Sequence, residues 1–178
     1  MRVLNLMLVG VLLVVVGLPL RRSRAATSPC LLADGAPARQ GLHAVYLKDE
    51  HRLCLQDGRH TVWSSVASHG RKAGQKHFEG DERTPEGAYT LSPARASRRF
   101  GAFLALSYPN ADDLRYAREH SKRPGGSIGI HGPQVWYAFL GSWQALVDHS
   151  DGCLVLDERG VAELAARVSA PLPIDILK

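Results

Sequence analysis

Apolar and polar residues alternate in several short runs from residue 43 onward, which is the spacing of half-buried β-strands. The dipeptide Asp57-Gly58 separates two of these runs and is a strong signal for a hairpin turn. The expected strands are 43–48, 52–56, 61–66, the end of 84–91, 102–107, 127–130 and 154–156. So many short strands close together predict a β-rich domain.

Two segments have the periodicity and the end signals of helices. The first is the middle of 108–123, where Asn110 suits the N-cap. The second follows Asp157 and ends before Pro171, and its apolar face is formed by Val161, Leu164, Ala165 and Val168. Between them, 133–147 is expected to be a loop or partly helical. The pattern as a whole predicts a β-rich α+β fold, and 178 residues suffice for one compact domain.

The first 26 residues differ from the rest of the chain. Residues 3–20 are almost wholly apolar, with an arginine before them, three after them, and Ala25-Ala26 at the end. This pattern predicts either a signal peptide cleaved near Ala26 or an uncleaved N-terminal membrane anchor. Both place the domain outside the cytoplasm, unless the arginines that follow the apolar run invert the topology. We expect 27–41 to be a short linker and 42–178 to be the folded domain.

The basic charge of the chain belongs mostly to this leader. The net charge is +5, and residues 1–26 hold four arginines and no acidic residue, so the remainder is close to neutral at +1. A nucleic-acid partner is therefore not expected, because it needs a concentrated basic face. A membrane is expected as a partner only through the N-terminal segment, if that segment is retained. Arg98-Arg99 is either a solvated surface pair or a contact for an acidic substrate.

Three cysteines follow the leader: Cys30, Cys54 and Cys153. In an oxidising compartment an odd number leaves at least one thiol outside any intramolecular pair. The simplest pairing joins Cys30 to Cys54 and leaves Cys153 free, and the alternative is three isolated thiols. The sequence has no CxxC or HExxH spacing, so we expect no metal and no cofactor.

Cys153 follows a glycine and precedes an apolar run, so it lies where a turn meets a strand. Taken alone it fits a buried hydrophobic residue. A base and backbone amides nearby would instead lower the thiol pKa and make it a nucleophile. His131 ends a predicted strand far away in the sequence and is the first candidate for the base. His149, in the same turn as Cys153, is the second.

Three motifs in order resemble a known family. Thr84-Pro-Glu-Gly-Ala-Tyr89, Ile130-His131-Gly132 and Ser150-Asp-Gly-Cys153 are similar to the L,D-transpeptidase (YkuD-type) catalytic domain of bacterial cell-wall enzymes. The resemblance covers roughly 42–178. It implies a single domain of mixed twisted sheets with two helices, located in the periplasm or cell envelope. It also implies that peptidoglycan stem peptides are the substrate.

The resemblance assigns a role to each site residue. It implies that Cys153 is the nucleophile and His131 the general base, with a backbone carbonyl near Gly132 orienting the imidazole. Ser150 and Gly152 would shape the turn, and the amides of Gly152 and Cys153 would donate to the oxyanion.

Two positions depart from the commonest motif of the family. Asp151 replaces a histidine, and Val155 replaces a basic or amide residue, so the means of holding the substrate's carboxylate is open. The segments 107–112 and 124–132 look more like the YafK/DpaA branch, which includes enzymes that detach lipoprotein from peptidoglycan. This similarity adds a peptidoglycan-attached lipoprotein as a candidate partner.

These observations define the functional hypotheses. The first is cysteine-dependent acyl transfer on stem peptides through a thioester, as in an L,D-transpeptidase. The alternative is a hydrolase of the same branch that cleaves stem-peptide or lipoprotein bonds. Two hypotheses from other classes are a catalytically inactive cell-wall-binding module, and a redox protein in which Cys153 pairs with Cys30 or Cys54.

Overall fold

The computed structural model describes residues 30, 40–134 and 143–178, and it confirms a single β-rich α+β domain of mixed sheets with two helices. The leader 1–26, most of the linker 27–41 and most of the segment 133–147 lie outside the described residues. The elements are β1 (Leu42–Leu47), β2 (Arg52–Asp57), β3 (His60–Val66), β4 (Gly87–Leu91), β5 (Arg95–Ser97), β6 (Gly101–Ala105), α1 (Ala111–Glu119), β7 (Gly129–His131), β8 (Leu154–Val155), α2 (Glu158–Arg167) and β9 (Leu172–Leu177).

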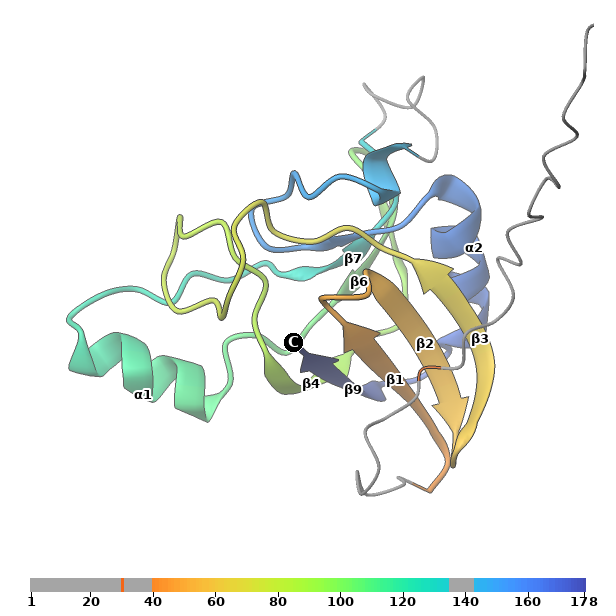
Figure 1. The fold of residues 1–178 in the computed structure, drawn as a ribbon, viewed down its shortest axis with the longest axis horizontal. Helices are drawn as coiled ribbons and strands as arrows, with labels where there is room; N and C mark the ends of the chain where they lie inside the picture. Colours follow the sequence, from red (N-terminus) through yellow and green to blue (C-terminus); the bar gives the residue numbers. More distant parts are fainter. Residues whose placement is uncertain (1–29, 31–39, 135–142) are drawn as a thin grey trace, which may run out of the picture.

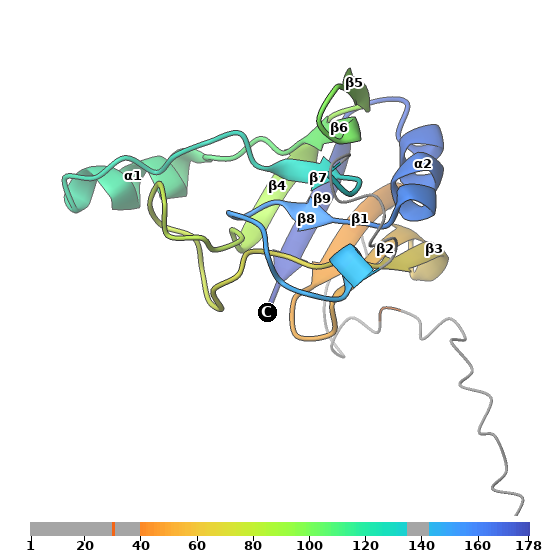
Figure 2. The same ribbon diagram turned by 90° about the horizontal axis from the view of Figure 1, so that it is seen from above.

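The strands form two sheets. One has the order β3-β2-β1-β9-β4 and the other has the order β5-β6-β7-β8 (Figures 1 and 2). Most neighbouring strands are antiparallel, but β1 pairs with β9 in parallel and so does β7 with β8. The hairpin predicted at Asp57-Gly58 connects β2 to β3, and Gly58 has the positive φ of +59° that such a turn requires.

All seven predicted strands are present with shifted ends, whereas β5 and β9 were not predicted. The C-terminal strand β9 lies between β1 and β4, although Pro173 interrupts its apolar pattern. Proline lacks an amide proton and is rare in a strand with neighbours on both sides. Here Pro173 pairs only with Thr90 of β4, and the pairing with β1 begins one residue later at Ile174. The sheet tolerates the proline because β9 has a neighbouring strand on only one side at this position.

Both helices begin at the predicted caps. Asn110 Oδ1 accepts hydrogen bonds from the amides of Asp112 and Asp113, at 2.9 and 3.0 Å, and Asp157 Oδ1 accepts one from the amide of Gly160 at 2.6 Å. The α2 face packs into the main core through the side chains of Val161, Leu164 and Val168. Figures 1 and 2 show α1 at the opposite end of the molecule from α2.

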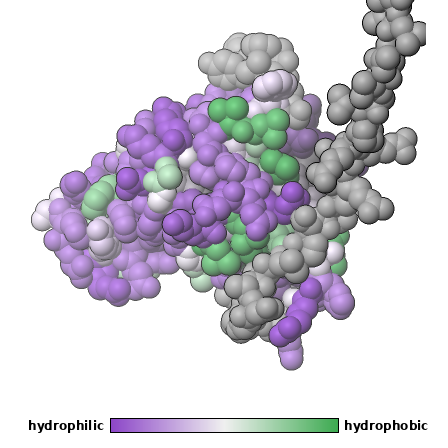
Figure 3. Space-filling view, viewed as in Figure 1, coloured by the Kyte–Doolittle hydropathy of each residue, from purple (hydrophilic) through white to green (hydrophobic). Residues whose placement is uncertain are grey.

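A disulfide joins Cys30 to Cys54 of β2, so the segment before the domain is tied to the first sheet. Both cysteines are buried and form a small second core with Val45 and Leu47 of β1. Among the described residues no helix is both long and apolar enough to cross a membrane. The face of the domain in Figure 3 is mainly hydrophilic, with apolar side chains in small groups.

We predict that β9 contributes strongly to stability despite its proline. Ile174 and Leu177 lie in this strand, but Ile174 is 1% exposed and Leu177 is 40% exposed. Ile174→Ala leaves a cavity in the core and should lower the free energy of unfolding by about 2–5 kcal/mol. Leu177→Ala is the matched control and should change it by less than about 0.5 kcal/mol. Urea denaturation measures both, and equal effects would contradict the placement of β9 in the core.

Candidate active site

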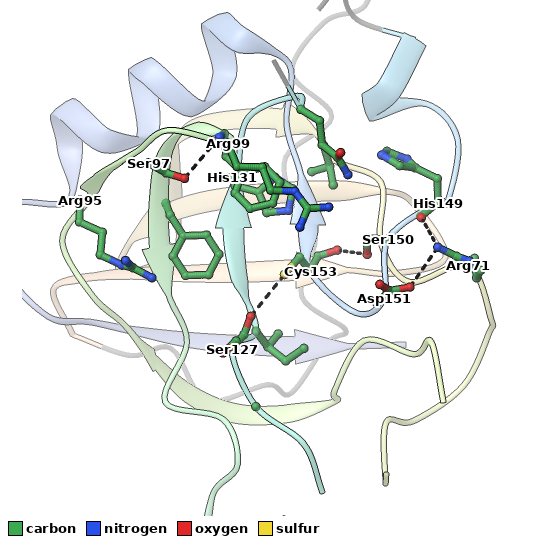
Figure 4. A pocket seen from close by; sticks show the side chains of 16 residues that line it. Arg71, Arg95, Ser97, Arg99, Ser127, His131, His149, Ser150, Asp151 and Cys153 are labelled. Carbon is green, nitrogen blue, oxygen red and sulfur yellow. Dashed lines mark hydrogen bonds and ion pairs between the residues drawn. The ribbon is translucent and has the colours of Figure 1, made fainter. Parts of the chain in front are cut away.

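His131 and Cys153 meet because β7 and β8 are parallel. The pairs are Ile130 with Leu154 and His131 with Val155, so His131 ends β7 and Cys153 immediately precedes β8. Side chains two residues apart in a strand share a face, so Cys153 lies on the same face as Val155 and His131. Both line a pocket of about 460 Å³ (Figure 4). The structure therefore brings together the two residues that the sequence predicted as nucleophile and base.

The His131 ring is held on one side by an aromatic ring and at one nitrogen by a carbonyl. The ring stacks on Phe100 with centroids 3.8 Å apart, and Nδ1 donates to the Gly132 carbonyl oxygen at 2.7 Å. In a neutral imidazole this hydrogen bond fixes the proton on Nδ1 and leaves Nε2 as an acceptor. The backbone carbonyl thus has the orienting role that the sequence predicted near Gly132.

Burial keeps both reactive groups neutral. It lowers the pKa of His131 to about 4, against the Gly132 hydrogen bond that raises it, and the nearby charges of His149 and Arg99 lower it further. Burial also raises the pKa of the Cys153 thiol, although an amide hydrogen bond from Gly129 lowers it. Of the two interpretations of Cys153, the thiol pKa follows the buried one, because desolvation raises it more than the Gly129 amide lowers it. At pH 7 the pair is a thiol beside a neutral imidazole.

The turn before Cys153 is closed by the Ser150 hydroxyl. Ser150 Oγ donates to the Cys153 carbonyl oxygen at 2.6 Å and accepts from the Gly152 amide at 3.1 Å. The Gly152 amide thus already has a hydrogen-bond partner, and its donation to an oxyanion stays a prediction. Gly152 has a φ of +132°, and a Cβ there would lie 2.5 Å from the Arg83 carbonyl oxygen, so only glycine fits.

Thr84 also holds this turn in place through its side-chain hydroxyl, a role that the sequence analysis did not assign. Its side chain is fully buried, and Oγ1 donates to the Gly152 carbonyl oxygen and accepts from the Gly70 amide, both at 2.9 Å. Thr84 is the first residue of the motif Thr84-Pro-Glu-Gly-Ala-Tyr89, so the motif pointed to this residue but did not show its structural role. The contact explains why a distant Thr-Pro motif accompanies the cysteine turn.

The Cys153 thiol points toward the loop before β7. Sγ lies 3.7 Å from the Ser127 carbonyl oxygen, which is within reach for a thiol donor. Ser127, Phe100 and the arginines 95 and 99 also line the pocket, and the sequence analysis assigned a candidate contact only to Arg99. The clusters around these residues are formed by folding, so no local spacing in the sequence identified them.

The second candidate base and its neighbour lie on the outer side of the pocket. His149 lines the pocket, and its Nδ1 donates to the Val147 carbonyl oxygen at 2.7 Å on the exposed surface. Asp151 is exposed and forms an ion pair with Arg71, whose nitrogen lies 3.0 Å from the carboxylate. His131 is buried and stacks on Phe100, whereas His149 is only half-buried, and this favours His131 as the base.

The chain belongs to the L,D-transpeptidase catalytic domain family, YkuD, whose model matches residues 42–176. Among curated proteins no sequence matches the chain. Solved structures share the fold at low identity. The helical cell shape determining protein Pgp2 from Campylobacter jejuni has a TM-score of 0.62 and 23% identity over 76% of this chain and 47% of that one.

Two further structures show the same fold. Bd1075 from Bdellovibrio bacteriovorus has a TM-score of 0.55 and 22% identity, over 78% of this chain and 48% of that one. An L,D-transpeptidase from Mycobacterium smegmatis has a TM-score of 0.51 and 15% identity, over 77% of this chain and 58% of that one. The chain thus spans about half the length of these structures.

We predict that Cys153 reacts slowly with small electrophiles at neutral pH. The thiolate is the reactive form, and burial raises the thiol pKa, so alkylation by iodoacetamide should accelerate about tenfold per pH unit through pH 9. Denatured protein is the matched control, because its thiol has the ordinary pKa of about 8.5. Mass spectrometry measures both rates. A plateau below pH 8 that His131→Ala abolishes would reveal a thiolate–imidazolium pair and contradict the neutral pair.

Proposed function

We propose that this protein catalyses cysteine-dependent acyl transfer on peptidoglycan stem peptides through a thioester, as an L,D-transpeptidase. One observation carries the proposal. In a chain that belongs to this family, the parallel pairing of β7 and β8 places Cys153 and a buried, carbonyl-anchored His131 in one pocket. A nucleophile and an oriented base in a pocket are the requirements of thioester chemistry.

The neutral resting pair indicates the order of proton transfers. His131 Nε2 takes the thiol proton as sulfur attacks a carbonyl next to diaminopimelate, so the charge forms only with substrate present. The tetrahedral oxyanion then collapses, the amine leaves with the proton from the imidazolium, and the thioester remains. Because Ser150 occupies the Gly152 amide, we assign the oxyanion contact within this turn to the Cys153 amide.

The second candidate function is hydrolysis of the same thioester. It is favoured by Val155, which is fully buried and stands where the commonest family motif has a basic or amide residue. The likeness to the YafK/DpaA branch points the same way and adds a peptidoglycan-attached lipoprotein as candidate substrate. The two reactions share every step up to the thioester and differ only in the second nucleophile. A role in cell-wall biogenesis and cell shape is compatible with both.

The proposal includes a location. Residues 1–26 would carry the domain across the inner membrane, as a cleaved signal peptide or as a retained anchor, to the periplasm or cell envelope. A disulfide between Cys30 and Cys54 supports an oxidising compartment. The same disulfide is buried, which counts against a redox protein in which Cys153 exchanges with either cysteine. A binding module without catalysis would need no anchored imidazole beside the thiol.

Muropeptide analysis tests the proposal. The full-length chain in mild detergent is incubated with peptidoglycan that carries attached lipoprotein, beside the Cys153→Ala variant, and the products are identified by mass spectrometry. New 3→3 cross-links or exchanged terminal residues that the variant lacks indicate a transpeptidase. Released peptide or lipoprotein without new bonds indicates a hydrolase. His131→Ala should lower either rate by about 10²- to 10⁴-fold.

A result without any Cys153-dependent product would contradict both reactions and favour the cell-wall-binding module. Protein bound to sedimented peptidoglycan in the same incubation identifies that case. His149→Ala is the control for the base, because His149 lines the same pocket but is only half-buried and stacks on no ring among the described residues. An equal loss of activity in both histidine variants would contradict the assignment of His131.

A further inference from the structure

Val155 stands where the commonest family motif has a basic or amide residue, so the pocket lacks that residue's contact to a substrate carboxylate. Val155 is fully buried and lines the pocket beside Cys153, and its side chain has no group that could form a hydrogen bond. Stem peptides carry carboxylates close to the proposed scissile bond, and taking such a charge out of water is costly unless a cation meets it. Other residues of the pocket have to supply that cation.

Three arginines line the pocket, and one of them is already paired. Arg71 contacts the Glu82 carboxylate at 3.3 Å, the Asp151 carboxylate at 3.0 Å and the His149 carbonyl oxygen at 3.0 Å. Neither Arg95 nor Arg99 has an ion pair with any residue that the structure describes. Figure 4 shows these two arginines on the His131 side of the pocket and Arg71 on the opposite side.

Each unpaired guanidinium lies over an aromatic ring of the pocket. Arg95 is 4.9 Å from the centroid of Phe103, and Arg99 is 5.0 Å from that of Phe100, which itself stacks on His131. Stacking of this kind restricts a long side chain but leaves the N–H edge of the guanidinium available for a carboxylate. The two arginines are therefore partly preorganised for bidentate binding of an anion.

We infer that Arg95 and Arg99 form a carboxylate subsite that holds the free α-carboxylate of the amino acid released from the stem peptide. The position of the two arginines on the His131 side of the pocket indicates which carboxylate of the stem peptide they bind. His131 protonates the leaving amine, and in an α-amino acid the carboxylate is one carbon from that amine. The arginines beside the His131 stack are thus placed for the leaving residue. This inference rests on the proposed function and adds a preference for a terminal residue with a free carboxylate.

The test compares a stem tetrapeptide with the same peptide amidated at its C-terminus. The full-length chain should have a kcat/KM about 10- to 100-fold higher for the free acid, the usual range for a hydrogen bond to a charged group. In the Arg95→Ala/Arg99→Ala variant this preference should disappear, because kcat/KM for the free acid falls towards that for the amide. Arg98→Ala is the matched control, because Arg98 is a neighbouring exposed arginine that does not line the pocket.

A preference that persists in the double variant, or an equal loss on both peptides, would overturn the subsite. Binding of both peptides to the Cys153→Ala variant, measured by calorimetry, applies the same comparison without turnover. If this variant prefers the acid and the preference needs the two arginines, the subsite stands even where no cleavage occurs. Absence of Cys153-dependent chemistry then contradicts the proposed function alone, so the two failures are distinguishable.

A separate cluster of metal-ligating side chains is formed by His51, His69 and Asp148, none of which lines the pocket. Nε2 of His51 and Nε2 of His69 are 3.0 and 3.3 Å from the same Asp148 oxygen, and the three ligand atoms lie within 4.8 Å of one another. His69 is 7% exposed. Two of these separations are close to the roughly 3.3 Å between ligands of a tetrahedral zinc ion with bonds of about 2.0–2.1 Å.

The hydrogen bonding of His69 suits a metal ligand. Its Nδ1 faces the Gly70 carbonyl oxygen at 2.9 Å and so carries the proton. A ring N–H bonded to a backbone carbonyl is the usual outer support of a metal-bound histidine.

We propose that His51, His69 and Asp148 bind one divalent transition metal ion, with Zn²⁺ as the best match to two imidazoles and a carboxylate. No local motif marks this site, because the ligands come from three segments that are distant in sequence. Gly70 bridges to Ser150, and the Arg71 amide donates to the Ser150 carbonyl oxygen at 3.0 Å. An ion in this cluster would therefore brace the strand segment on which the cysteine turn rests.

Calorimetry with Zn²⁺ on the chelator-treated full-length chain tests this site. One ion per chain is expected, and Co²⁺ should give the visible absorption of a tetrahedral complex. His51→Ala and Asp148→Asn should each weaken Zn²⁺ binding more than about 100-fold, beyond the usual loss for an outer-shell change. His60→Ala, at an exposed position of β3, is the control and should bind normally. No binding by the parent chain, or normal binding by both ligand variants, would overturn the site.

Discussion

The pairing of β7 with β8 is the constraint on which the site depends. It comprises two residue pairs, yet it sets His131 and Cys153 on one face of a sheet. So short a ladder needs support on its other side. The Leu156 amide donates to the His131 carbonyl oxygen at 2.9 Å, and Ser68 exchanges both backbone hydrogen bonds with Val155 at 3.0 and 2.9 Å. The strand after the cysteine is thus held between β7 and the segment following β3.

Burial of this pair determines how it is charged. An exposed thiol and imidazole would exchange a proton readily, but here desolvation disfavours the charged form of each. The resting state is therefore an uncharged pair, and separation of charge awaits a carbonyl that can accept the sulfur. A protonated thiol is also the form that resists oxidation, because oxidants react with the thiolate. The same burial thus makes the free thiol of Cys153 resistant to oxidation.

Features set by neighbouring residues could be predicted from the sequence. The caps Asn110 and Asp157 and the Asp57-Gly58 turn depend only on residues beside them in the chain. β9 was missed because its pairing with β1 is distant in sequence and Pro173 weakens its pattern. The hydrogen bond from the Gly152 amide to Ser150 Oγ was not predicted. It occurs in a turn in which Gly152 has a positive φ, and the sequence does not specify that angle.

The distribution of charge around the pocket bears on the choice between water and an amine. Arg71 is neutralised by Glu82 and Asp151, so the free positive charge lies on the His131 side with Arg95 and Arg99. A subsite that releases an α-amino acid binds an attacking α-amino acid by the same contacts, through microscopic reversibility. The side chain of diaminopimelate ends in an amine and a carboxylate on one carbon, so it fits this description. Water needs no such contact. In the proposed reaction, hydrolysis of the thioester is therefore expected only when no amino acid fills the subsite that the leaving residue has emptied.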